Sequence, residues 1–141
     1  MDHTEETGAG GSATTRPAAE PSTLGRAAME SVERRVRWLS TADIDHANRV
    51  RRNPSGMKVG GHQASCASMT SIMTALWFHG LTAQDRVSVK PHASPVLHAI
   101  NYLLGTLDAS YLTTLRSFGG LQSYPSRLKL TDAIDGWVSR I

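Results

Sequence analysis

Apolar positions in the first third of the chain recur with the period of an α-helix. One stripe predicts a helix from about Leu24 to Leu39, and its members are Met29, Val32, Val36 and Leu39. Ser40 is then a suitable N-cap for a second helix, with acidic residues in its first turn and arginines near its end. The Asn53-Pro54 pair predicts the end of that helix, because proline cannot continue it.

The next segment, residues 60–80 (GGHQASCASMTSIMTALWFHG), contains no Asp, Glu, Lys or Arg. Its large apolar residues again follow a helical stripe, made of Met69, Ile72, Met73 and Leu76. The positions between them are mostly Ala, Ser and Thr, so no side of this helix is charged. Such a helix is typically buried on all sides. We therefore expect it to run through the interior of a large domain or a subunit interface.

The remaining pattern predicts one strand followed by two helices. Arg86–Val89 alternates polar and β-branched residues, which is typical of a strand. Ser94 and Pro95 are suited to the N-cap and first position of a helix that ends at Gly105. Asp108 is suited to cap a final helix that ends before Gly119-Gly120. Helix, strand and helix in this order predict a helix-rich α/β fold.

The composition and charge of the chain argue against nucleic-acid-binding and membrane proteins. The chain has 141 residues, 40% of them hydrophobic, and a formal charge of +3. Nine of the fifteen basic and eight of the twelve acidic residues precede residue 59, so the surface is mixed and no nucleic-acid partner is expected. No run of 18 apolar residues predicts a membrane helix. The single cysteine, Cys66, and the lack of a signal peptide favour a cytoplasmic protein. Residues 1–22 are small and polar, and we expect a disordered tail there.

Two histidines occupy similar places in this pattern. His62 follows two glycines at the start of the charge-free helix, and His92 lies between the predicted strand and the helix capped by Ser94. Helix N-termini and the carboxyl ends of strands attract anionic ligands, to which a histidine can donate a hydrogen bond. The alternative, that both are loop or cap residues without a ligand, is equally compatible with their positions. No metal-binding motif is visible, and Cys66 is expected to be a buried structural thiol.

A longer run of residues resembles a known family. The segments STADIDHANRVR, NPSGMKVGGHQASCASMTSIMTALWFHGL, DRVSVKPHASPVLHAINYLLGTLD and YLTTLRSFGGLQSYPSRLK are similar to the N-terminal part of thiamine diphosphate-dependent enzymes of the transketolase type. Within that family the similarity is greatest to the homodimeric bacterial pyruvate dehydrogenase E1 component. It runs from about Glu33 to Lys129, and the ordered pair Gly-Gly-His and His-x-Ser-Pro is its most specific feature.

The resemblance implies a fold and a chemistry. Residues 23–129 would be the N-terminal part of a pyrophosphate-binding domain, which in the family binds thiamine diphosphate and Mg²⁺ between two subunits. His62 would face the reacting carbon as a catalytic residue, and His92 with Ser94 would lie on the cofactor side. The implied reaction is decarboxylation of a 2-oxoacid, with pyruvate the first candidate. Ketol transfer between sugar phosphates is the alternative within the family.

Departures from the family pattern limit what this chain can do alone. The family's magnesium and diphosphate site uses a Gly-Asp-Gly that this chain lacks, and no metal ligand is assigned. After Lys129 the sequence diverges, so residues 130–141 would be a divergent end of a truncated or frameshifted product. We expect no cofactor binding or activity by the chain alone. The missing remainder of the enzyme or a full-length paralogue would be its partner, and a non-catalytic remnant is the other alternative.

Overall fold

The computed structural model describes residues 25–82 and 84–123. The long helices are α1 (Arg26–Asp45), α2 (Gln63–Ala75) and α3 (Ser94–Leu103). Short helical turns accompany them, namely η1 (His46–Val50), η2 (Leu76–Gly80), η3 (Pro91–Ala93) and η4 (Ala109–Thr113). The expected tail of residues 1–22 and the divergent end of residues 130–141 lie outside the described residues.

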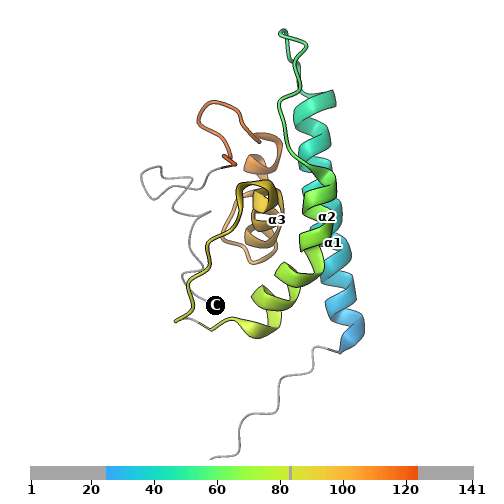
Figure 1. Ribbon diagram of the computed structural model, residues 1–141, viewed down its shortest axis with the longest axis vertical. Helices are drawn as coiled ribbons and strands as arrows, with labels where there is room; N and C mark the ends of the chain where they lie inside the picture. Colours follow the sequence, from blue (N-terminus) through green and yellow to red (C-terminus); the bar gives the residue numbers. More distant parts are fainter. Residues whose placement is uncertain (1–24, 83, 124–141) are drawn as a thin grey trace, which may run out of the picture.

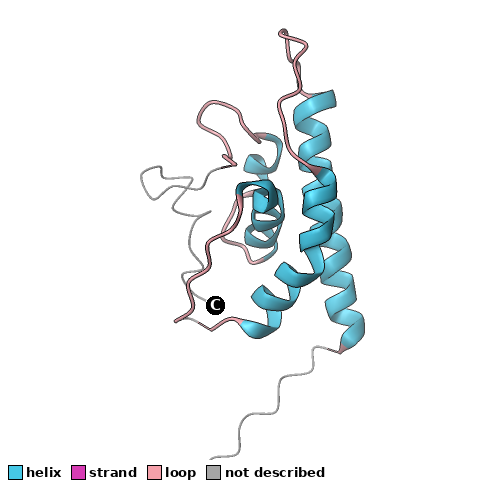
Figure 2. Ribbon diagram, viewed as in Figure 1, coloured by secondary structure: helices cyan, strands magenta, loops and turns pink. Residues whose placement is uncertain are grey.

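The three long helices pack against one another. Figure 1 shows α2 returning alongside α1 in the opposite direction, and α3 lies against both. The connection between α1 and α2 forms one tip of the molecule (Figure 2). None of the described helices is both long enough and apolar enough to cross a lipid bilayer.

The two helices expected on either side of Ser40 form a single helix. Ser40 is almost fully buried within α1, and its hydroxyl donates to the Arg37 carbonyl at 3.1 Å, so it is not an N-cap. Neither glycine nor proline interrupts this stretch, and a serine can remain helical by bonding to the preceding turn. The stop before Asn53-Pro54 is confirmed, because η1 ends at Val50.

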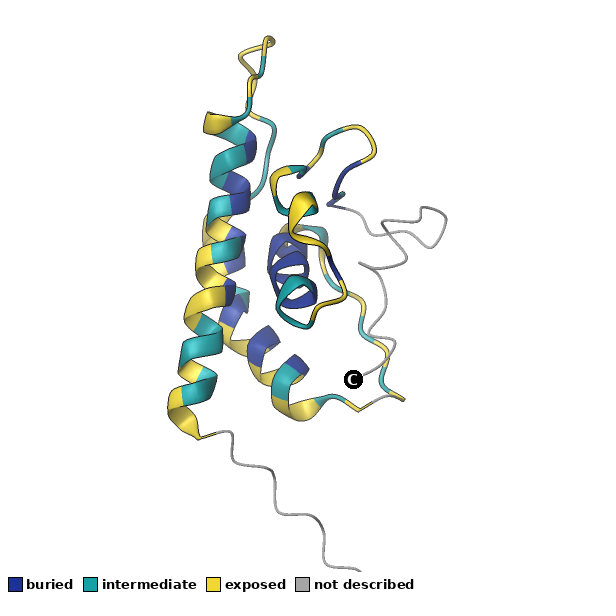
Figure 3. Ribbon diagram, turned by 180° about the vertical axis from the view of Figure 1, so that it is seen from behind, coloured by how far each residue is buried: buried dark blue, intermediate teal, exposed yellow. Residues whose placement is uncertain are grey.

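Helix α2 buries one face only, so the expectation of burial on every side is wrong within this chain. The buried residues are Cys66, Thr70, Met73, Thr74 and, in η2, Trp77. On the opposite face, Ile72 is 54% and Leu76 is 38% exposed. Figure 3 shows one-sided burial along α1 and α2, whose buried positions are directed toward α3. Of the predicted stripe, Met73 is buried whereas Ile72 and Leu76 are exposed, because α1 and α3 contact the side of α2 that carries Cys66, Thr70, Met73 and Thr74.

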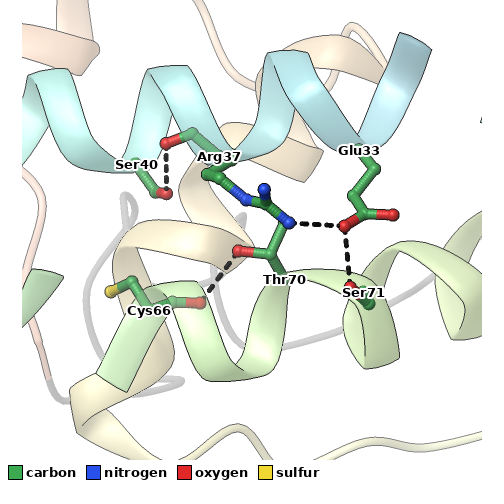
Figure 4. A network of polar contacts seen from close by, with 6 residues as sticks. All are labelled: Glu33, Arg37, Ser40, Cys66, Thr70 and Ser71. Atoms are coloured by element: carbon green, nitrogen blue, oxygen red, sulfur yellow. Dashed lines mark hydrogen bonds and ion pairs between the residues drawn. The ribbon is translucent and has the colours of Figure 1, made fainter. Parts of the chain in front are cut away.

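A polar network joins the outer edges of α1 and α2 (Figure 4). The Glu33 carboxylate accepts hydrogen bonds from the Arg37 guanidinium at 2.6 Å and from the Ser71 hydroxyl at 2.7 Å. Thr70 donates to the Cys66 carbonyl at 2.9 Å within α2. Glu33 is partly exposed, so its ion pair with Arg37 adds little stability. Its bond to Ser71 links α1 to α2 at a defined position along both helices.

The described residues contain no strand, and the strand predicted at Arg86–Val89 is wrong. Val87 and Val89 are partly buried against the core whereas Arg86 and Ser88 are exposed, so the alternation correctly predicted which side chains face inward. A strand also requires a neighbouring strand that supplies hydrogen-bond partners. Residues 25–82 and 84–123 provide none here, and the α/β class is therefore not seen in this part of the chain.

The C-terminal elements follow their sequence signals more closely. Helix α3 starts at Ser94 with Pro95 in its first turn, but its N-cap is Ala93, so Ser94 is not the predicted N-cap. A 3₁₀ turn precedes the helix, and the Ser94 hydroxyl bonds back to it. Gly105 has a φ of +75°, and the Thr106 N–H bonds to the Asn101 carbonyl at 2.9 Å, which closes the helix as expected. Asp108 accepts from the Ser110 N–H at 2.8 Å, but the element that it caps is only a 3₁₀ turn.

Candidate histidine site

The two histidines singled out by the sequence meet in space. The His62 and His92 rings stack with their centroids 4.7 Å apart and their planes inclined by 24°. Both side chains are exposed to solvent. His62 is the N-cap residue of α2, and His92 lies in the 3₁₀ turn before α3. His62 and His92 are 30 residues apart in sequence, and their imidazole rings bring the starts of α2 and α3 together.

The turn before His62 requires its two glycines. Gly60 has a φ of +114° and Gly61 a φ of +93°, values that residues with a Cβ rarely adopt. A Cβ on Gly61 would lie 2.9 Å from Cγ1 of Ile44 in α1, closer than ordinary contact allows. The backbone therefore passes directly over α1 before α2 begins, which brings His62 to the edge of α1.

Cys66 fixes the backbone of His92 from the first turn of α2. Its thiol lies 3.3 Å from the His92 carbonyl, and its N–H donates to the His62 carbonyl at 3.0 Å. Burial raises the pKa of the Cys66 thiol to about 11, with a smaller contribution from the Asp43 carboxylate and an opposing one from the Val96 N–H. A thiol that is neutral at physiological pH is a poor nucleophile, so Cys66 supports the site without reacting.

Ser94 follows His92 by two positions and begins α3. Its side chain is fully buried, and its hydroxyl donates to the Pro91 carbonyl at 2.7 Å. In this arrangement the hydroxyl stabilises the 3₁₀ turn that carries His92. Ser94 as a cofactor-binding residue stays a prediction that rests on the resemblance alone.

A surface depression of about 360 Å³ adjoins His62. The ionisable side chains that line it, besides His62, are Asp45, Arg49 and Lys58. Asp45 is paired with Arg49 at 2.8 Å, so Lys58 and the first N–H groups of α2 give the depression a positive character. An anionic group is therefore the ligand that it suits best.

The donor set does not fit a magnesium diphosphate by itself. In the part of the chain that the structure describes, no group of three or more His, Cys, Asp or Glu side chains could hold a metal ion. Two imidazoles and a lysine can contact an anion, but the carboxylate ligands that Mg²⁺ prefers are not gathered here. These residues would supply at most one side of a cofactor site.

The sequence did not indicate two residues that bond to the turn before His62, namely Asn48 and Arg116. Asn48 lies in η1 and bonds to both backbone polar groups of Gly60. Arg116 lies far along the chain and donates to the Val59 carbonyl at 2.9 Å. A signal was present only for the local bond from Asn48 to the Ile44 carbonyl, because asparagine side chains often bond to nearby backbone groups. None was present for Arg116, whose partner is 57 positions away.

Comparison with known proteins finds distant relatives of the chain. The chain is 32% identical over 111 residues to the pyruvate dehydrogenase E1 component of Mycobacterium tuberculosis, in an alignment that covers 68% of this chain. The pyruvate dehydrogenase E1 component of Mycolicibacterium smegmatis matches with the same identity and coverage. The chain is a distant relative of pyruvate dehydrogenase E1 components. No model of a protein family matches the chain, and no solved structure matches it.

The relationship concerns a small part of each E1 component. The chain spans 11% of the length of the curated relatives that it matches. The activity, substrates and partners of those complete proteins therefore reach this chain only as proposals.

Proposed function

We propose that this chain is a fragment of a thiamine diphosphate-dependent E1-like enzyme and is inactive alone. Residues 23–129 would form the beginning of the pyrophosphate-binding domain. The parent reaction would be decarboxylation of a 2-oxoacid, with pyruvate the first candidate, and transfer of its two-carbon unit. The observation that carries the proposal is the His62–His92 stack, because it unites the two motifs on which the resemblance depends.

The histidine pair is suited to one part of this chemistry. A solvent-facing imidazole can donate a hydrogen bond to a developing oxyanion or accept a proton. His62 stands at the N-terminus of α2 beside a positive depression, where an anionic carboxylate or phosphate would be attracted. His92 would contact the cofactor side. The cofactor supplies the carbanion chemistry in such enzymes, and these residues would orient and bind.

The exposed apolar face of α2 supports the proposal that this chain is part of a larger protein. Ile72 and Leu76 point away from the core that this chain forms, although the helix bears no charge on that side. We propose that the remainder of an E1-like enzyme, encoded separately or present in a full-length paralogue, covers this face. A complete enzyme of this kind would be a homodimer by analogy with the family.

A chimera tests the proposal. The aligned segment of the Mycobacterium tuberculosis E1 component is replaced by residues 25–123 of this chain, and pyruvate-dependent reduction of ferricyanide is measured. Activity that falls on His62→Ala but survives His79→Ala supports the proposal, since both histidines are exposed and only His62 belongs to the pair. A folded, dimeric chimera without activity would contradict it and favour a non-catalytic remnant.

A further inference from the structure

We propose that Asn48 and Arg116 are positioning residues that hold the Gly60-Gly61 turn and thereby place His62 against His92. This inference rests on the proposed function, since it explains how the histidine site is built. It concerns contacts between segments that are distant in sequence. The two residues would act directly on the stacking of His62 and His92, and on catalysis only through that stacking.

Asn48 binds the turn from one side. Its Nδ2 donates to the carbonyls of Ile44 and Gly60, both at 2.7 Å, and its Oδ1 accepts from the Gly60 N–H at 3.1 Å. A single amide thus satisfies both backbone groups of Gly60 and ties them to the last turn of α1. The residue lies in the π-helical turn η1 that follows α1.

Arg116 binds the turn from the other side. Its Nη1 donates to the Val59 carbonyl at 2.9 Å, and its Nε donates to the Ser123 hydroxyl at 2.7 Å. A Cβ on Gly60 would overlap the guanidinium, so Gly60 provides the space in which Arg116 lies. The turn is therefore bonded to Asn48 at Gly60 and to Arg116 at Val59.

The backbone of Arg116 is strained in a way that this role explains. Its φ of +56° is the only positive value among the described residues other than glycine. The left-handed region is unfavourable for a residue with a Cβ, and it persists only where the surroundings determine it strongly. Arg51 supports the same segment, since it donates to the Leu115 carbonyl at 2.8 Å and to the Ser117 hydroxyl at 2.7 Å. The strained conformation aims the Arg116 guanidinium at Val59.

The test uses the full chain with its histidine rings labelled with ¹³C. In the unmodified chain we expect a nuclear Overhauser contact between the ring protons of His62 and His92. Asn48→Ala should abolish it and should accelerate exchange of the Gly60 amide roughly 2- to 12-fold, the effect of one lost hydrogen bond. If Asn48→Ala does not fold, Asn48→Asp serves the same purpose, because it keeps the acceptor for Gly60 N–H but places a carboxylate against the Gly60 carbonyl.

Arg116→Gly separates positioning from general stability. Glycine relieves the left-handed strain, which offsets part of the lost hydrogen bonding, so the contact should disappear with little change in melting temperature. The matched controls are Asn53→Ala, whose side chain bonds within the same loop, and Arg37→Ala, whose guanidinium bonds to Glu33. Both should retain the histidine contact.

Three outcomes would overturn the inference. They are an absent contact in the unmodified chain, a contact that persists in a folded Asn48 or Arg116 variant, and an equal loss in the Asn53 control. Because none of these measurements needs catalysis, they can fail while the chimera is active. Conversely, an inactive chimera would leave the positioning of His62 intact.

Discussion

Ionisation of Cys66 should make the chain less stable at alkaline pH. Burial raises the pKa of this thiol from 9.0 to about 11, so the folded state keeps the proton more tightly than the unfolded state. Well below pH 9 both states are protonated, and the thiol does not affect the free energy of unfolding there. As the pH rises from 9 to 11, the unfolded thiol loses its proton first and unfolding is favoured. The loss should be about 1.4 kcal/mol at pH 10 and should approach about 2.7 kcal/mol above pH 11.

Cys66→Ser isolates this effect, because Cys66 is the chain's single cysteine. A serine hydroxyl can still donate to the His92 carbonyl but does not ionise in this range. Urea unfolding followed by tryptophan fluorescence at constant ionic strength, from pH 7 to 10.5, gives the free energy of each variant. The unmodified chain should lose stability relative to Cys66→Ser as the pH rises. Parallel curves would refute the reasoning, since tyrosines and lysines titrate alike in both proteins.

Four further substitutions have defined expectations. Gly61→Ala combines backbone strain with a contact to Ile44 and should cost about 2–5 kcal/mol, whereas Gly56→Ala, with open space around it, should cost only about 1–2 kcal/mol; thermal denaturation compares them. In the active chimera, His62→Ala should lower kcat by roughly 10²–10⁴, and an unchanged kcat would exclude an acid–base role. His92→Ala should instead weaken apparent cofactor affinity by about 1.5–3 kcal/mol, measured as activity against thiamine diphosphate concentration.

Local sequence signals predicted where helices begin and end better than which faces they bury. Proline and glycine fix backbone geometry whatever the surroundings, and Gly105 ends α3 as expected. Ser40 was misleading, because a serine fits both an N-cap and a helix interior, and only packing decides between them. The segment at Arg86–Val89 has the side-chain alternation of a strand, but pairing depends on another segment that no local pattern reveals.

In the candidate site, too, local features could be predicted from the sequence but long-range contacts could not. The positions of His62 and His92 at helix starts could be predicted, and the family resemblance paired them, but their stacking depends on the path of the backbone between Val59 and His62. We have proposed that contacts from Asn48 and Arg116 determine that path, since both residues bond to it. Single-sequence patterns describe neighbours three or four positions apart, so a contact across 57 positions was beyond their reach.

The two faces of α2 are arranged unlike those of a helix in a self-sufficient small domain. The buried face includes Thr70 and Thr74 beside Met73, while Ile72 and Leu76 are among the exposed large apolar residues. A helix in a self-sufficient domain would be more stable if Ile72 and Leu76 were buried too, because exposed apolar area gives no hydrophobic stabilisation. Exposed apolar side chains on a charge-free face are typical of surfaces that meet another protein layer. The same pattern would follow if this segment originated in the larger core of an E1-like enzyme, which is why the distant relationship and the exposed face of α2 support one proposal.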